Sequence, residues 1–224
     1  MLVMLGMMTA ASTQAQAAPQ RVTESRTICS ITPVPAGWVI TSSQNAFCPG
    51  SGVQYTIANT AGQTSLLACS FSPLPDGWVV TRSFNTASCA GSGVYYGIAS
   101  VAGKTEIGAC SLSPIPAGWV VTRSFSSIDC VGTGVAYALM NVAGKNYVDG
   151  VCSMSPIPAG WVVTRGYSST NCLGTGVAYT IVQAGQGSIV VCSYSPVPDG
   201  WIISRSLNTS SCAGTGWAYE IRRA

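Results

Sequence analysis

The stretch SPIPAGWVVTR occupies residues 113–123 and returns, letter for letter, at residues 155–165. Near-copies stand at residues 32–42, 72–82 and 195–205. The prolines and glycine of the SPIPAG part are incompatible with a helix and with the inside of a sheet, so the chain must turn there. The GWVVTR part is rich in β-branched and aromatic residues, which favours a strand. The sequence therefore predicts a turn followed by a strand in each of the copies.

The cysteines give these copies a period. There are 10 cysteines in 224 residues, and the first of each pair stands at positions 29, 69, 110, 152 and 192. Self-similarity at a period of about 41 residues indicates a repeat architecture. A unit of this length cannot bury its own apolar face, so the units must stack on one another or be stapled covalently. The five predicted repeats are residues 26–63, 64–104, 105–145, 146–186 and 187–224.

Each repeat reads as three short strands. The first leads into the leading cysteine, as in SLLACSF at residues 65–71, and the second is the GWVVTR run. The third alternates, so that Val53, Tyr55 and Ile57 share one face, as expected for a half-buried antiparallel strand. A glycine-containing stretch such as residues 61–63 follows, and we expect it to be a hairpin loop. The predicted fold class is all-β, built from five tandem three-stranded repeats.

Five repeats can be arranged in two ways. One is a closed, propeller-like ring of five blades, and the alternative is an open linear array. We favour the ring, because residues 21–30 supply a leading strand that would lie beside the third strand of the last repeat. Three strands per repeat, where a propeller blade usually has four, count against it.

The even number and regular spacing of the cysteines predict a disulfide framework. Metal binding is disfavoured, since the chain has no histidine and no CxxC pair. One pairing that respects the repeat crosses the boundaries between units and closes the ring through Cys29 and Cys212. The other joins cysteines within units, and we favour it because the spacing within units is nearly constant. The pairs within units are Cys29–Cys48, Cys69–Cys89, Cys110–Cys130, Cys152–Cys172 and Cys192–Cys212.

Residues 1–17 read as a secretory signal peptide, in which a short apolar stretch precedes Ala15-Gln16-Ala17, an A-x-A cleavage pattern. The alternative is a buried N-terminal helix. Residues 18–25 then form a lead-in to the repeats. No apolar stretch is long enough to be a transmembrane segment. Together with the cysteines, this predicts a secreted protein, extracellular or periplasmic.

Composition argues against several classes of function. Only 8% of the residues are charged, the net charge is +3, and the arginines are spread along the chain, so nucleic acid is not an expected partner. Without histidine there is no Ser-His-Asp or Cys-His arrangement, and no carboxylate recurs in every repeat as an acid–base pair or a calcium site would require. We therefore expect no enzyme activity, no cofactor and no metal site.

Tryptophan and arginine recur at fixed positions of the second strand and are the candidate ligand-binding residues. Alternate residues of a strand share a face. Each tryptophan should therefore lie on the same face as the valine two residues later and the arginine four residues later. The plainer interpretation makes each tryptophan a core plug and each arginine its solvated end. The sharper one makes them a repeated aromatic-plus-polar pocket for a sugar ring. The candidates are Trp38, Trp78, Trp119, Trp161, Trp201, Arg82, Arg123, Arg165 and Arg205, with Ser42 in place of arginine in the first repeat.

Five copies of one weak site give avidity when a ligand can engage several of them at once. Our leading hypothesis is multivalent, lectin-like binding of an extracellular glycan or another cell-surface ligand. One alternative is a structural, envelope-associated repeat protein without a small ligand. Another is an inhibitor of an extracellular enzyme that acts through a proline-rich loop. The sequence favours no particular oligomeric state.

Overall fold

The computed structural model describes residues 23–224, so the predicted signal peptide at residues 1–17 and most of the lead-in at residues 18–25 lie outside the described residues. The described chain forms 15 strands and no helix, arranged as three-stranded antiparallel sheets. Each sheet corresponds to one predicted repeat, and we number these units 1 to 5 along the chain. The all-β repeat fold is therefore confirmed.

The three strands of a unit are similar in length from one unit to the next. The first strands are β1 (Ser25–Cys29), β4 (Ser65–Cys69), β7 (Glu106–Cys110), β10 (Tyr147–Cys152) and β13 (Ser188–Cys192). The second strands are β2 (Trp38–Asn45), β5 (Trp78–Asn85), β8 (Trp119–Ser126), β11 (Trp161–Ser168) and β14 (Trp201–Asn208). The third strands are β3 (Val53–Asn59), β6 (Val94–Ser100), β9 (Val135–Asn141), β12 (Val177–Gln183) and β15 (Trp217–Arg223).

The third strand lies in the middle of each sheet. In unit 2, for example, β6 pairs on one side with β4 and on the other with β5. The glycine stretch that follows a third strand, such as residues 61–63, is therefore not the hairpin loop we expected. It leads instead to the first strand of the next unit, because the third strand already has both its partners within its own unit.

The proline-rich stretch makes a tight turn into each second strand. In unit 2 the amide of Trp78 donates a hydrogen bond to the carbonyl of Pro75 (3.1 Å), and Gly77 between them has a φ of +73°. Since no residue other than glycine has a positive φ in the described chain, this is a type II turn, which needs glycine at its third position. The same turn recurs in every unit, and this explains the invariable Gly-Trp pair.

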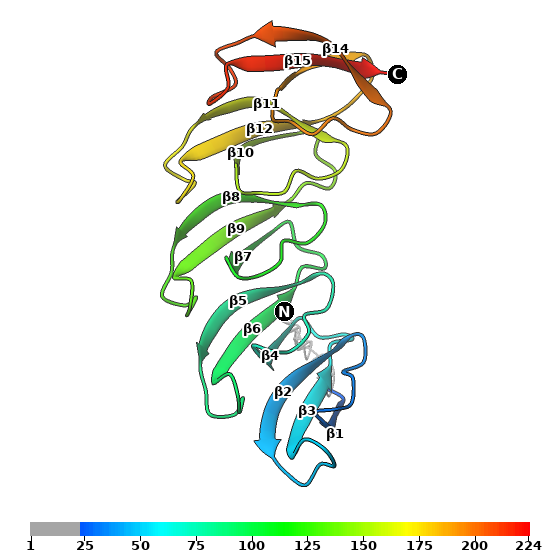
Figure 1. Cartoon of the computed structure of the whole chain (residues 1–224), viewed down its shortest axis with the longest axis vertical. Helices are drawn as coiled ribbons and strands as arrows, with labels where there is room; N and C mark the ends of the chain where they lie inside the picture. The colour runs from blue at the N-terminus through cyan, green and yellow to red at the C-terminus, as the bar shows by residue number, and fades with distance from the viewer. Residues whose placement is uncertain (1–22) are drawn as a thin grey trace, which may run out of the picture.

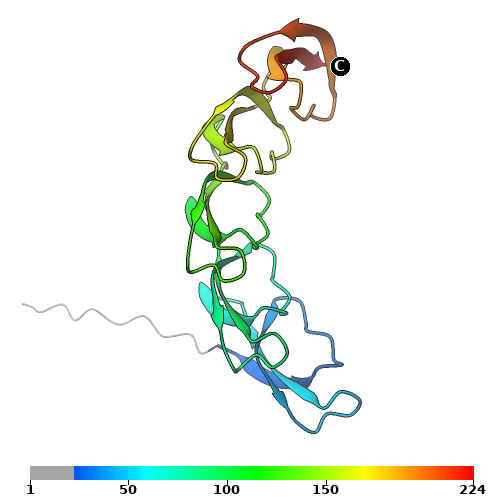
Figure 2. The same ribbon diagram turned by 60° about the vertical axis from the view of Figure 1, so that its left-hand side comes forward.

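The units form an open, gently curved array, with unit 1 and unit 5 at opposite ends (Figures 1 and 2). Each second strand packs against the first strand of the next unit, as β2 does against β4 and β11 against β13. Among the described residues, no strand of unit 1 contacts a strand of unit 5. The ring that we favoured is therefore wrong and the open array is correct, because the turn from one unit to the next is too small to close a circle with five units.

The disulfides pair within units, as predicted. Their Cα–Cα distances lie between 5.3 and 5.5 Å, in the usual range for a disulfide. Each bridge ties the end of a first strand to the loop that precedes the third strand. All ten cysteines are paired, which is typical of proteins outside the reducing cytoplasm. Within residues 23–224, no helix is long and apolar enough to cross a membrane.

A serine joins each unit to the one before it, and it is buried at three of the four junctions. At the junction of units 3 and 4, the hydroxyl of Ser155 accepts a hydrogen bond from the amide of Val121 (2.9 Å) and donates one to the carbonyl of Pro156 (3.2 Å). This serine opens the SPxP motif, and unit 1, which no described unit precedes, has Thr32 in its place. The equivalent amide–hydroxyl bonds at the other junctions are Ile40–Ser72, Val80–Ser113 and Val163–Ser195.

A second backbone contact crosses each junction further along the second strand. The amide of Ser124 donates to the carbonyl of Asn171 (2.9 Å), and its hydroxyl donates to the carbonyl of Leu173 (3.1 Å). Unit 4 has Gly166 at the equivalent position, because a Cβ atom there would collide with the hydroxyl of Tyr194 from unit 5. Among the described residues this hydroxyl is buried without a hydrogen-bond partner, and burial raises the pKa of Tyr194.

Candidate ligand-binding surfaces

The structure separates the candidate tryptophans from the candidate arginines. Trp78, Trp119 and Trp161 are only 7%, 3% and 5% exposed, and each belongs to a core cluster that crosses a junction between units. Trp38 and Trp201, in the two end units, are half-buried. The four candidate arginines, by contrast, are all exposed. This placement agrees with the plainer interpretation, in which tryptophan is a core plug and arginine a solvated end.

A β-bulge in the second strand causes this separation. In unit 2 the pairing with β6 shifts between Val80 and Arg82, so Thr81 is an extra residue whose hydroxyl donates to the carbonyl of Gly97 (3.0 Å). The alternation of the strand is interrupted there, and the predicted face shared by tryptophan, valine and arginine does not extend to the arginine. The same register shift occurs in every unit.

Beyond the bulge, the arginine lies over the aromatic ring two residues further along. The guanidinium carbon is 5.5 Å from the ring centroid in the pair Arg82–Phe84, 4.8 Å in Arg123–Phe125 and 5.3 Å in Arg165–Tyr167. These distances are within the range of a cation–π interaction. We call Arg82, Arg123 and Arg165 the arginine row, since they occupy equivalent positions in successive units.

This pair of arginine and aromatic ring is absent from the two end units. Arg205 in unit 5 forms an ion pair with Glu220 (2.8 Å) and has no aromatic partner in the equivalent place, which Leu207 occupies. Unit 1 has Ser42 and Gln44 in place of the arginine and the ring. We did not predict the aromatic partners, although the spacing that shows them, Arg-x-Phe or Arg-x-Tyr, is visible in the sequence.

In unit 2, space for the arginine comes from a glycine on the middle strand. Gly97 lies opposite Arg82 in the register, and a Cβ atom there would lie 2.6 Å from the Cγ of Arg82. The side chain of Arg82 therefore lies directly across the backbone of β6. The corresponding neighbours in the next two units are Ala138 and Thr180.

Unit 4 has an acidic group beside its arginine. Asp149 lies in a bulge of β10, where the longer first strand shifts register between Val148 and Val151. Its carboxylate accepts hydrogen bonds from the hydroxyls of Thr180 (2.6 Å) and Tyr167 (3.0 Å). Burial by itself would raise the pKa of Asp149, but these hydrogen bonds, together with the backbone amide of Gly150 and the charge of Arg165, outweigh burial and hold the pKa below its ordinary value.

A second kind of surface, which we call the junction grooves, lies where the proline turns of adjacent units face each other. The grooves between units 2 and 3, 3 and 4, and 4 and 5 have volumes of about 510, 830 and 440 Å³. The three grooves have the same construction. Their walls are the proline turns of both units and the tryptophan of the unit that comes later in the chain. Each groove is also lined by the residue that follows the third strand of the earlier unit, which is Val101, Val142 or Ala184.

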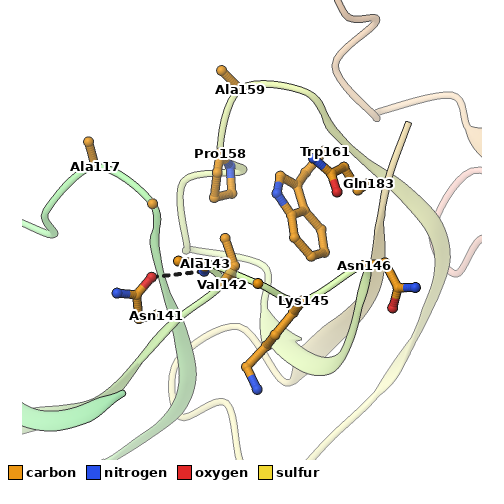
Figure 3. Close-up of a pocket in the computed structure, with 12 residues that line it drawn as sticks. Ala117, Asn141, Val142, Ala143, Lys145, Asn146, Pro158, Ala159, Trp161 and Gln183 are labelled. Carbon is orange, nitrogen blue, oxygen red and sulfur yellow. Dashed lines mark hydrogen bonds between the residues drawn. The ribbon is translucent and has the colours of Figure 1, made fainter. Parts of the chain in front are cut away.

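The groove between units 3 and 4 is the most polar of the three in its side chains. Figure 3 shows the indole of Trp161 between Pro158 and Gln183, with Lys145 and Asn146 on the opposite side. At one end, the side-chain oxygen of Asn141 accepts a hydrogen bond from the amide of Ala143 (2.9 Å), which leaves its NH₂ group to donate. A groove with an apolar wall and several amide groups provides the contacts that orient a small polar ligand.

Comparisons of the chain with protein-family models, with curated protein sequences and with solved structures found no match. Within the described residues, no group of three or more histidine, cysteine, aspartate or glutamate side chains could hold a metal ion. What the geometry offers is therefore two repeated surfaces, the junction grooves and the arginine row, on an open array of disulfide-stapled β units.

Proposed function

We propose that this is a secreted, multivalent binding protein that holds an extended extracellular carbohydrate along its junction grooves. The observation that carries the proposal is the recurrence of one concave site at three successive junctions. A polymer with repeating sugars presents the same groups at regular intervals, and a row of equivalent grooves is suited to such a ligand. Affinity is expected to come from simultaneous engagement of several grooves.

The lining of the groove between units 3 and 4 supports a sugar as the ligand. Amide side chains such as Asn146 and Gln183 offer both donors and acceptors for hydroxyl groups. Proline rings and the edge of Trp161 provide apolar contact for the C–H faces of a sugar ring. Since Trp161 is only 5% exposed, it contributes an edge and not an open stacking platform.

Binding of the oxidised protein to a broad glycan array, followed by titration calorimetry with the best oligosaccharides, tests the proposal. Affinity should rise steeply with oligosaccharide length, as the ligand reaches a second and a third groove. The variant Asn146→Ala/Gln183→Ala should weaken binding, because both side chains are exposed in the groove between units 3 and 4. The matched control is Asn85→Ala, an exposed amide that lines none of these three grooves.

Failure of every glycan to bind would contradict the proposal and leave the structural alternative. A structural, envelope-associated protein would instead fractionate with cells or matrix whether or not Asn146 and Gln183 are replaced. An inhibitor that acts through one reactive loop is the weakest of the three hypotheses, since all five proline turns have the same geometry.

A further inference from the structure

We propose that the arginine row, Arg82, Arg123 and Arg165, binds the anionic groups of a linear extracellular polysaccharide, one carboxylate or sulfate group per unit. The row lies four residues beyond the tryptophans of the junction grooves, which is about 13 Å along an extended strand. It uses different side chains from the grooves. The inference therefore stands independently of the function proposed above.

The three guanidinium groups are exposed and held in place. Among the described residues none of them forms an ion pair, although Asp149 lies near Arg165, whereas Arg205 at the equivalent position is paired with Glu220. Contact with the ring of Phe84, Phe125 or Tyr167 restrains each guanidinium group. A planar fork of N–H donors that is already oriented is suited to bidentate binding of carboxylate or sulfate.

The backbone is built to present these groups. Bulges redirect side chains and are common next to functional sites. Here a bulge precedes the arginine in units 2 to 5, and the hydroxyl of its extra residue satisfies a carbonyl of the middle strand, as Thr81 does for Gly97 (3.0 Å) and Thr122 for Ala138 (3.3 Å). The same local structure thus places one arginine in each of units 2 to 5.

The charge pattern favours a polysaccharide over a nucleic acid. Nucleic-acid surfaces are densely basic, because phosphates follow one another closely along each strand. This chain has a net charge of +3 and only 8% charged residues, and its row supplies a single cation per unit. Such wide spacing is suited to a polymer whose acidic groups recur at intervals, and the disulfides are typical of a protein that meets such polymers outside the cytoplasm.

Three polymers with one backbone test the inference: neutral dextran, carboxymethyl dextran and dextran sulfate, immobilised and probed with the oxidised protein at low salt. We expect binding to one or both anionic forms and none to neutral dextran, and the two anionic arms show which group is preferred. The triple variant Arg82→Gln/Arg123→Gln/Arg165→Gln should lose affinity by at least about tenfold. The dependence of log K on log salt should become shallower as the arginines are removed, because fewer charge contacts remain for salt to screen.

The repeat offers a matched control and two gains of function. Arg205→Gln removes the same charge from the same position of unit 5, where Glu220 already neutralises it, so affinity should hardly change. Glu220→Gln frees Arg205, and Ser42→Arg/Gln44→Phe supplies the missing pair in unit 1, so both should raise affinity. Thermal unfolding and intact disulfides show whether each variant is folded.

Four results would overturn the inference. They are failure to bind both anionic dextrans, equal binding to neutral dextran, an Arg205→Gln variant as weak as the triple variant, and tighter binding to a single-stranded oligonucleotide than to either anionic dextran.

Discussion

Replacing Ser155 by alanine tests what holds one unit to the next. Ser155 is 6% exposed, and its hydroxyl accepts a hydrogen bond from the amide of Val121 (2.9 Å). Val121 is 0% exposed. Alanine would leave that amide buried without an acceptor, which costs about 1–3 kcal/mol. Loss of one oxygen atom leaves almost no cavity, so the unpaired amide dominates. We therefore expect the free energy of unfolding to fall by about 1–3 kcal/mol.

Guanidinium unfolding of the oxidised protein, followed by tryptophan fluorescence, measures the loss. Hydrogen exchange locates it, since the amide of Val121 should exchange faster in the variant than in the parent. The control is Thr32→Ala at the equivalent exposed position of unit 1, where no described unit supplies an amide, and its effect should stay within about 0.5 kcal/mol. Equal losses for the two variants, or unchanged exchange at Val121, would refute the reasoning.

Three further predictions follow from the same contacts. Replacing the disulfide Cys110–Cys130 by a pair of alanines should lower the free energy of unfolding by about 3 kcal/mol, measured by calorimetry, because the bridge closes a loop with a sequence separation of 20. Gly166→Ala should destabilise the junction of units 4 and 5 by about 1–3 kcal/mol in thermal melts, and adding Tyr194→Phe should restore most of the loss, since it removes the colliding, unpartnered hydroxyl. Thr180→Val should raise the pKa of Asp149 towards its ordinary value in an NMR titration. Because this pKa is lower in the folded than in the unfolded protein, ionised Asp149 stabilises the fold at pH values above its unfolded pKa. That stabilisation is lost as the pH falls through the folded pKa.

The units, their strands and their disulfides could be predicted from the sequence because each depends on short-range chemistry. Proline and glycine fix the turn before each second strand, and a constant spacing reveals which cysteines close the same loop. The order of strands within a sheet could not be predicted in this way. The stretch at residues 61–63 looks like a hairpin loop, but it leads to another unit because β3 pairs with both β1 and β2.

The ring and the shared face of tryptophan and arginine were wrong for a common reason. Both depend on registers between strands that are far apart in sequence. The bulge at Thr81 is set by the pairing of β5 with β6, and alternation within β5 alone gives no sign of it. Closure depends on the small rotation between neighbouring units, which results from the packing of whole side-chain layers across each junction.

The differences between unit 1 and the others indicate why the repeated residues are repeated. Units 2 to 5 have an apolar residue in the first strand that packs near the tryptophan, as Ile189 packs with Trp201 in a cluster that includes Val162 of unit 4. Unit 1, with no described unit before it, has Arg26 at this position, and its guanidinium carbon lies 4.4 Å from the ring centroid of Trp38. An arginine covers the indole and remains hydrated, whereas an apolar side chain there would be exposed. Thr32, at the position of the junction serines, departs from the repeat at the same face. The positions of Arg26 and Thr32 are therefore expected to be junction positions in units 2 to 5, and substitutions at them should destabilise units 2 to 5 more than unit 1.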